Sequence, residues 1–191
     1  MEFFKYKNAL QPGKGKMLVS EPYLSDPNFG RTIILLCEHN AEGSFGFVLN
    51  KPSMARIADV LEDLKEIDAP VYIGGPVQQD TLHFIHQCAD LEGATEISPG
   101  VYWGGNFESL LIHLDLQKVK VEDVKFFLGY SGWSAGQLEE ELKVDSWIVS
   151  DNVTQELVFE TDHQEMWQKA LKIMGGRFSV YSNYPSDPRD N

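Results

Sequence analysis

The apolar residues of this chain gather mostly in short runs of roughly four to eight residues, the length typical of β-strands. Strands are predicted at 16–20, 32–38, 44–49, 70–73, 81–87, 96–103, 147–149 and 156–160. The run at 32–38 (TIILLCE) shows no polar alternation, which predicts a strand covered on both faces. Residues 40–43 are predicted to form the hairpin turn between the second and third strands, and Pro99-Gly100 interrupts the strand at 96–103.

Three other segments repeat apolar residues at helical spacing. The first is predicted to begin at a Ser53 cap, the second at an Asn106 cap, and the third at a capping box formed by Asp162 and Glu165. Their apolar faces are Ile57, Val60, Leu61 and Leu64; Phe107, Leu110, Leu111 and Leu114; and Met166, Trp167, Ala170, Leu171 and Met174. Gly175-Gly176 is expected to end the third helix.

The segment 125–142 (KFFLGYSGWSAGQLEEEL) predicts a strand, a turn and a helix, and the rest of the chain is arranged around it. Its apolar run 126–128 is expected to enter a loop carrying Gly129, Gly132 and Gly136, and a Gln/Glu-rich helix to leave it. Many strands with few helices indicate an α+β fold. We expect a mixed, largely antiparallel sheet or partial barrel flanked by about three to four helices.

The length of 191 residues and a hydrophobic content of 42% are typical of one globular domain. We expect a single domain over 1–191, with a basic N-terminal arm at 1–14 that includes Lys5, Lys7 and Lys14, and a frayed polar tail at 181–191. No apolar stretch is long enough to span a membrane, and the start lacks the apolar core of a signal peptide. Cys37 and Cys88 are expected to be free thiols, so the predicted location is the cytoplasm.

The net charge of −13 opposes binding to phosphate backbones. No predicted helix is basic: Arg56 stands near Asp59, Glu62 and Asp63. Because a DNA-recognition helix needs a positive surface around it, direct DNA binding is disfavoured.

Several short motifs stand in a fixed order along the chain. They are 26–29 (DPNF), 46–52 (GFVLNKP), 74–77 (GGPV), 129–133 (GYSGW), 136–142 (GQLEEEL) and Trp147. Together they resemble the bacterial AlgH/YqgE family over roughly residues 15–175. The resemblance implies a cytoplasmic, single-domain α+β protein with no agreed biochemical activity and no assigned catalytic residues. Some members of that family are labelled transcriptional regulators because of effects on exopolysaccharide synthesis.

The segment 132–136 (GWSAG) matches the G-x-S-x-G nucleophile elbow of serine hydrolases, which makes Ser134 a weak catalytic candidate. The single histidine after it is His163, only 29 residues on (163 − 134), which leaves little room for the rest of a hydrolase fold. The motif that the family resemblance carries does not fix a serine at this place. A capping box between Ser134 and Gln137 explains the same residues, so we interpret them as structural and the protein as non-enzymatic.

Metal and phosphate sites are also disfavoured by the sequence. His83, His86 and Cys88 are close together, but a strand points His83 and His86 to opposite faces. The glycine pairs 74–75 and 104–105 match no phosphate-binding motif and are interpreted as tight turns. No metal or cofactor is predicted.

The remaining candidates for binding are Tyr130, Trp133 and Gln137 in the central segment, with Asn50 and Lys51 beside them. The alternative is a rigid core turn with Trp133 buried. We therefore expect a regulatory or binding protein that acts through an unidentified protein partner or small ligand. A direct DNA-binding regulator and a hydrolase using Ser134 are the alternatives.

Overall fold

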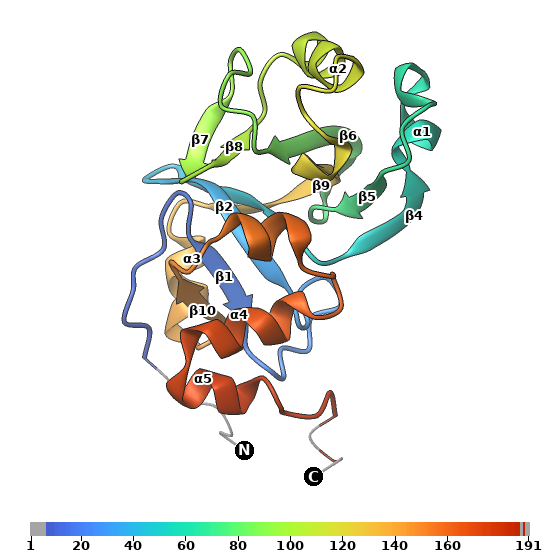
Figure 1. Ribbon diagram of the computed structural model, residues 1–191. Helices are drawn as coiled ribbons and strands as arrows, with labels where there is room; N and C mark the ends of the chain where they lie inside the picture. Colours follow the sequence, from blue (N-terminus) through green and yellow to red (C-terminus); the bar gives the residue numbers. More distant parts are fainter. Residues whose placement is uncertain (1–6, 188, 190–191) are drawn as a thin grey trace.

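The computed structural model describes residues 7–187 and 189 of the chain, so Lys5 and the end of the predicted tail lie outside the described residues. It contains a ten-stranded sheet in which the main order is β10-β1-β2-β3-β9-β6-β8-β7, with β5 paired to β9 and β4 paired to β5 (Figure 1). The strands are β1 (Met17–Ser20), β2 (Ile33–Asn40), β3 (Gly43–Val48), β4 (Pro52–Arg56), β5 (Pro70–Ile73), β6 (Val77–His86), β7 (Thr95–Ser98), β8 (Val101–Trp103), β9 (Val124–Ser134) and β10 (Trp147–Ser150).

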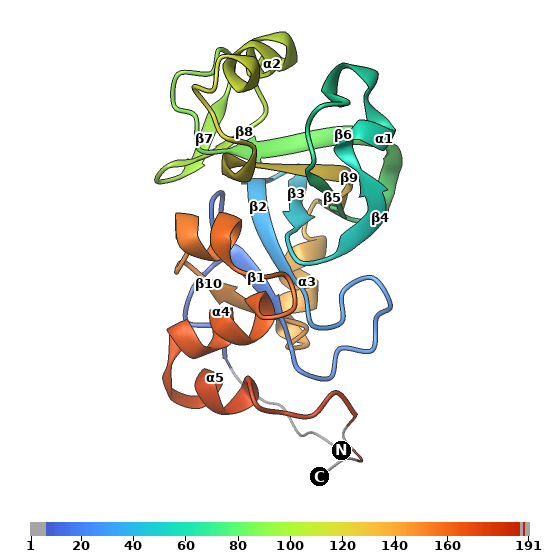
Figure 2. The same cartoon turned by 45° about the vertical axis from the view of Figure 1, so that its right-hand side comes forward.

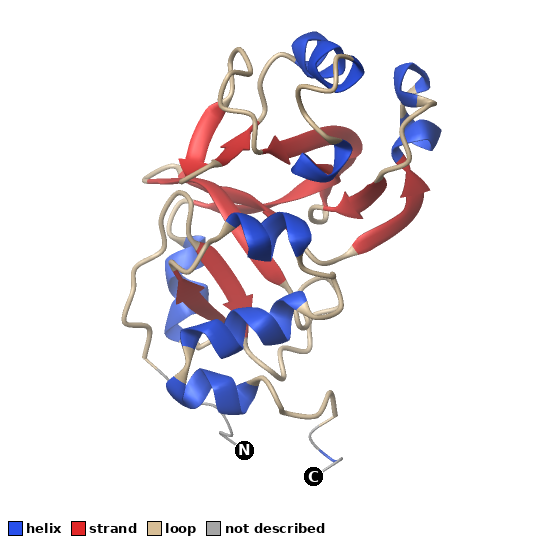
Figure 3. Cartoon of the chain, in the orientation of Figure 1, coloured by secondary structure: helices blue, strands red, loops and turns tan. Residues whose placement is uncertain are grey.

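The helices are short and lie outside the sheet (Figure 3). They are α1 (Ile57–Val60), α2 (Phe107–Asp115), α3 (Gln137–Lys143), α4 (Met166–Met174) and α5 (Gly176–Tyr181), with the 3₁₀ turns η1 (Glu62–Leu64) and η2 (Val121–Asp123) and the π-helical turn η3 (Glu156–Glu160). Among the described residues, no helix is long and apolar enough to cross a membrane. The predicted α+β class is confirmed, and the sheet is open rather than a closed barrel.

Strand β9 joins two halves of the sheet. Its first part, Val124–Leu128, pairs antiparallel with β6 and parallel with β5, whereas its last part, Ser131–Ser134, pairs antiparallel with β3. We call the strands β1, β2, β3 and β10 with the end of β9 the lower half, and β4 to β8 with the start of β9 the upper half (Figures 1 and 2).

Both faces of the lower half are covered, as the unbroken apolar run of β2 predicts. Residues 33, 35 and 37 of β2 pack in a core cluster with α4, and residues 34 and 36 pack in another with Leu138 of α3. The period of two along a strand divides the side chains between the helix layers in this way. A third core cluster lies in the upper half, around Ile57, Leu110 and Phe126.

The prediction of a helix capped by Ser53 is wrong. Residues Pro52–Arg56 form β4, which pairs with β5, and Met54 is fully exposed. Strand pairing with β5 therefore overrides local helix propensity until Ile57. The helical turn starts there, where the Asp59 carboxylate accepts a hydrogen bond from the Arg56 N–H at 2.8 Å.

The predicted strand at 156–160 is a π-helical turn. Leu157 and Val158 are both buried although they are neighbours, which the alternation of a strand does not allow. Thr154 begins the turn, since its hydroxyl accepts the Leu157 N–H at 3.1 Å. The Thr161 N–H closes it by donating to the Glu156 carbonyl at 3.0 Å.

Two other boundaries differ from prediction. The chain stays in β9 through Gly129 and Gly132 instead of leaving as a loop, because Gly132 pairs with Phe45 of β3. Helix α4, the third predicted helix, begins at Met166, and Asp162 instead accepts the Gln164 N–H in the preceding turn. The other predicted strands and the Asn106-capped helix are confirmed.

The described part of the C-terminal tail makes specific contacts. The Arg31 guanidinium donates to the carbonyls of Tyr184 and Pro185, both at 2.6 Å. The Tyr184 ring stacks on Tyr23 at 5.8 Å. Tyr184 and Pro185 therefore contact the segment between β1 and β2.

Candidate ligand-binding pocket

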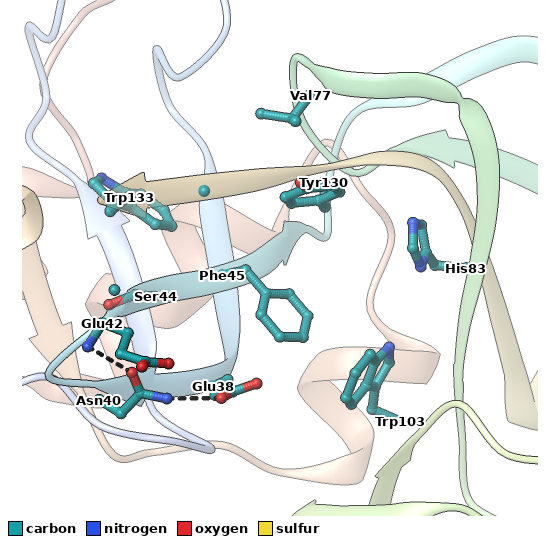
Figure 4. A pocket seen from close by; sticks show the side chains of 12 residues that line it. Glu38, Asn40, Glu42, Ser44, Phe45, Val77, His83, Trp103, Tyr130 and Trp133 are labelled. Atoms are coloured by element: carbon teal, nitrogen blue, oxygen red, sulfur yellow. Dashed lines mark hydrogen bonds between the residues drawn. The ribbon is translucent and has the colours of Figure 1, made fainter. Parts of the chain in front are cut away.

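An open pocket of about 550 Å³ lies where the upper and lower halves meet (Figure 4). It is lined by Glu38, Asn40, Glu42, Gly43, Ser44, Phe45, Val77, His83, Trp103, Tyr130, Gly132 and Trp133. These residues come from β2, β3, β6, β8 and β9 and from the turn between β2 and β3. The volume falls in the range of small-molecule sites, roughly 300–1,000 Å³.

Aromatic rings form the inner wall of the pocket. Phe45 lies edge-on to Trp103 at a ring-centroid distance of 4.9 Å and to Tyr130 at 6.1 Å. His83 continues the wall, edge-on to Tyr130 at 5.9 Å. Burial lowers the pKa of His83 below its ordinary value, so its imidazole is neutral at pH 7. The wall therefore presents the faces and edges of rings and no positive charge.

The rim of the pocket is acidic. Glu38 lies opposite Phe45 in the β2–β3 pairing, and Glu42 follows in the turn. Asn40 holds both in place: its side-chain amide donates to Glu38 Oε1 at 2.7 Å, and its side-chain oxygen accepts the Glu42 N–H at 2.8 Å. The lining residues include no lysine or arginine. The pocket combines an aromatic wall with two carboxylates.

The glycine motif at 74–75 positions Tyr130 in this wall. A Cβ atom on Gly75 would lie 2.2 Å from the Tyr130 backbone, and one on Gly74 would lie 2.4 Å from the Gly129 carbonyl oxygen. The Ser131 hydroxyl donates to the Gly74 carbonyl at 3.0 Å. Only glycine allows two backbones to approach this closely, so these residues serve as a close-packed crossing.

Trp133 is mostly buried and belongs to a hydrogen-bonded network behind the pocket. Its indole N–H donates to Glu141 Oε2 at 2.9 Å, and the indole N–H of Trp147 donates to the same oxygen at 2.8 Å. The other oxygen, Glu141 Oε1, accepts from the Gln137 amide at 3.2 Å. One carboxylate on α3 therefore satisfies two buried indoles and anchors the helix to the sheet.

The Ser134–Gln137 interaction differs from the predicted capping box. Gln137 Oε1 accepts from the Ser134 N–H at 3.0 Å and from its hydroxyl at 3.3 Å. The hydroxyl thus donates to a side chain and does not accept from the helix start. The residue before α3 is Gly136, with a φ of +77° that a residue with a side chain adopts only under strain.

The five predicted binding residues do not all meet at one place. Tyr130 and Trp133 line the pocket, whereas Gln137, Asn50 and Lys51 are not among its lining residues. Asn50 links two backbone segments by donating to the Arg31 carbonyl at 2.9 Å and accepting the Ile33 N–H at 3.1 Å.

Ser44 on β3, His39 on β2 and Glu139 on α3 form a row of neighbouring side chains. His39 Nδ1 lies 2.6 Å from the Ser44 hydroxyl, and His39 Nε2 lies 3.5 Å from Glu139 Oε1. Ser44 lines the pocket, but strand alternation directs its side chain away from the face that carries Phe45.

His83 and His86 have separate surroundings. His83 contacts Phe47 and Tyr130, whereas His86 accepts the Cys88 N–H at 3.1 Å and bonds the Gly104 carbonyl at 2.7 Å. No group of three metal-ligating side chains forms within the described part of the chain. Cys37 is buried and Cys88 half-buried, and both are free thiols.

Comparison with known proteins gives the family. A family model described as AlgH-like matches residues 17–179. The chain belongs to the AlgH-like family. Among its relatives are UPF0301 proteins of Chlorobaculum tepidum, 44% identical over 93% of this chain and 95% of the relative, and of Cytophaga hutchinsonii, 46% identical over 93% and 98%.

One solved structure supports the same assignment, and a second shows the same fold. The solution structure of the AlgH protein from Pseudomonas aeruginosa matches with a TM-score of 0.69 and 28% identity, over 93% of this chain and 98% of that one. A crystal structure from Corynebacterium diphtheriae has a TM-score of 0.77 at 21% identity, over 94% and 95%, and shows the shared fold. The AlgH/YqgE resemblance of the motifs is thus confirmed.

Most pocket residues were not predicted as binding residues. Glu38, Phe45 and Trp103 are far apart in the sequence, and only the pairing of β2, β3, β6, β8 and β9 brings them together. The available signal was the aromatic content of these predicted strands. Alternation along each strand identifies which aromatics share a face, but no local pattern tells which strands are neighbours.

Proposed function

We propose that this AlgH-like protein is a non-enzymatic binding protein whose aromatic pocket takes a cationic amine. The amine belongs to a small ligand or to a basic side chain of a protein partner. The observation that carries the proposal is the joining of an aromatic wall (Phe45, Trp103, Tyr130) with the carboxylates of Glu38 and Glu42 around one 550 Å³ pocket.

The chemistry of the wall and rim favours a cation. Aromatic faces attract ammonium groups by about 0.5–2 kcal/mol each, depending on how far water is excluded. Glu38 and Glu42 add Coulombic attraction, and the overall charge of −13 draws cations toward the surface. An anion would meet two carboxylates and a neutral imidazole. The apolar body of an amine would replace water against Val77 and Phe45.

The test compares 2-phenylethylamine with 2-phenylethanol, a neutral ligand of similar size, by calorimetric titration and by fluorescence of the pocket tryptophans. We expect the amine to bind roughly tenfold more tightly, which corresponds to about 1.4 kcal/mol. Glu38→Gln should remove most of this preference. Glu66→Gln, at a residue outside the pocket lining, should retain it. Equal affinity for the two compounds, or no saturable binding, contradicts the proposal.

The proposed setting is regulation in the cytoplasm through a protein partner. The free thiols of Cys37 and Cys88 suit a reducing compartment. The acidic charge suits a partner with a basic surface. Direct DNA binding is the less favoured alternative, and fluorescence anisotropy of a labelled DNA duplex tests it across salt concentrations. We expect no binding even at low salt; micromolar, salt-sensitive binding would support the DNA-binding alternative.

A second candidate function is acyl transfer by Ser44, favoured by the line of Ser44, His39 and Glu139. In this arrangement His39 takes the hydroxyl proton and Glu139 orients the imidazole. A fluorophosphonate probe distinguishes the two proposals. Labelling that maps to Ser44 and is lost in His39→Ala supports a hydrolase, whereas labelling at Ser134 supports the nucleophile-elbow motif. We expect neither serine to react.

A further inference from the structure

The side-chain amine of Lys125 is buried at the start of β9, in the upper half of the sheet. The segment KFFL alternates faces, so Lys125 shares a face with Phe127 and Tyr72 while Phe126 and Leu128 face the opposite side. Only 7% of Lys125 is exposed. Lysine is seldom buried to this extent unless it is paired with an acid or has a chemical role.

The amine has few polar contacts. Lys125 Nζ donates to the Val158 carbonyl at 3.3 Å and lies 4.0 Å from the Met166 sulfur. It stands 4.2 Å from the centroid of the Tyr72 ring. Between residues 7 and 187, no carboxylate is within ion-pair distance of this nitrogen. The π-helical turn supplies the acceptor, because carbonyls at the end of a short helix have no partner within it.

Lys125 and Tyr72 line a cavity of about 250 Å³, separate from the aromatic pocket. Its lining also includes the carboxylates of Asp68 and Glu122 and the apolar side chains of Val121 and Phe159. The titratable groups around the amine include Tyr72 from β5, Asp68 from the preceding loop and Glu122 from η2, and the charge of Asp162 also acts on Tyr72. Asp68 already pairs with Arg56.

Burial makes the amine a nucleophile. Loss of water around Nζ lowers the pKa of Lys125 to about 7, so the neutral amine is populated near neutral pH. The neutral amine has a free electron pair, which the ammonium form lacks. Lysines desolvated in this way are the ones that react with carbonyl compounds in proteins.

We propose that Lys125 is a reactive amine that forms an imine with a small, neutral aldehyde or ketone entering the cavity beside Tyr72. The electron pair of Nζ forms a bond to the carbonyl carbon while the C=O π electrons move to oxygen, and one of the two amine protons passes from nitrogen to that oxygen to give a carbinolamine. Loss of the hydroxyl group as water, together with the remaining proton on nitrogen, gives the imine. The reaction needs no other reactant and water reverses it.

The cavity also limits the carbonyl compound. Its volume of about 250 Å³ admits only a short chain. The carboxylates of Asp68 and Glu122 disfavour an anionic compound such as a 2-oxo acid. Val121, Phe159 and the Tyr72 ring give the cavity apolar walls that suit an uncharged aldehyde.

The experiment treats the full-length protein at pH 7 with propionaldehyde and cyanoborohydride, which reduces each imine to a stable secondary amine, and measures the rate at each lysine by peptide mass spectrometry. Lys65, an exposed lysine beside Glu62, is the internal control. We expect Lys125 to react at least tenfold faster than Lys65, with a rate that saturates as the aldehyde concentration rises and increases with pH through a midpoint near 7.

Two further results decide the matter, and the first uses the unaltered protein, so it does not depend on how a variant folds. Propionaldehyde should react at least tenfold faster than glyoxylate at Lys125 but at a similar rate at Lys65. In Lys125→Arg, which keeps a positive charge, no lysine of the protein should react at the fast rate expected for Lys125. A Lys125 rate equal to or below that of Lys65 would show that the amine only fills space in the core, and it would overturn the proposal.

Discussion

The network of Glu141 with two indoles offers a sharp test of how α3 is held to the sheet. In Glu141→Ala, the indole N–H groups of Trp133 and Trp147 lose their acceptor, although these residues are only 6% and 1% exposed. A lost hydrogen bond to a charged acceptor costs about 1.5–3 kcal/mol. Some water reaches the half-buried Glu141 position, so we expect the free energy of unfolding to fall by about 3–5 kcal/mol. The midpoint of thermal unfolding should fall on the order of 10 °C.

Urea unfolding followed by tryptophan fluorescence measures this change, because both indoles report directly. Glu140→Ala is the matched control: it removes a neighbouring carboxylate of the same helix that is exposed and pairs with Lys143. That change should cost at most about 0.5 kcal/mol. If Glu141→Ala destabilises the protein no more than Glu140→Ala, water satisfies the indoles and the network does not anchor α3.

Three other substitutions have defined outcomes. Gln137→Ala removes the acceptor of the Ser134 N–H at an exposed position and should cost only about 0.5–1.5 kcal/mol, measured by urea unfolding; a larger loss would give Gln137 a major structural role. Gly75→Ala places a Cβ atom 2.2 Å from the Tyr130 backbone and should cost at least roughly 3 kcal/mol, whereas Gly13→Ala meets no atom closer than 3.7 Å and should be nearly neutral. Lys125→Met should change how stability depends on pH. Because the pKa of Lys125 is about 7 in the folded protein and near 10.5 when unfolded, the unfolded chain binds more protons between these values, and stability rises with pH. From pH 7 to 8.5 the wild type should gain about 1.5 kcal/mol over the variant, and parallel curves for the two proteins would refute this.

Much of the fold could be predicted from local patterns, since a continuous run of apolar side chains is enough to indicate a buried strand. The doubly covered β2 is an example. The errors arose where distant pairing overrides local preference. The residues that follow Ser53 have a helical pattern, but the segment 52–56 forms a strand because it pairs with β5. The segment 156–160 has the composition of a strand, but it forms a π-helical turn that starts at the Thr154 hydroxyl and buries the neighbours Leu157 and Val158 together.

The sites were harder to predict than the fold for the same reason. Tyr130 and Trp133 could be proposed because an aromatic, glycine-rich segment is unusual by itself. Glu38 and Trp103 become recognisable as pocket residues only when the pairing of the strands is known. Lys125 precedes an apolar run and looks like the polar start of a strand. Its burial depends on the π-helical turn that the sequence did not indicate.

The sharing of β9 between the two halves has a consequence for the order of assembly. Strands β3 and β9 pair with each other, and Gly46 of β3 lies opposite Ser131 of β9. The whole segment 52–128, which forms the upper half, lies between these two residues in the sequence. The upper half is thus nested inside the lower half as a single excursion whose two ends lie side by side. Closing this long excursion is the entropically expensive step in forming the lower half, and folding the upper half first would shorten it. Native-state hydrogen exchange would then show the lower half opening before the start of β9.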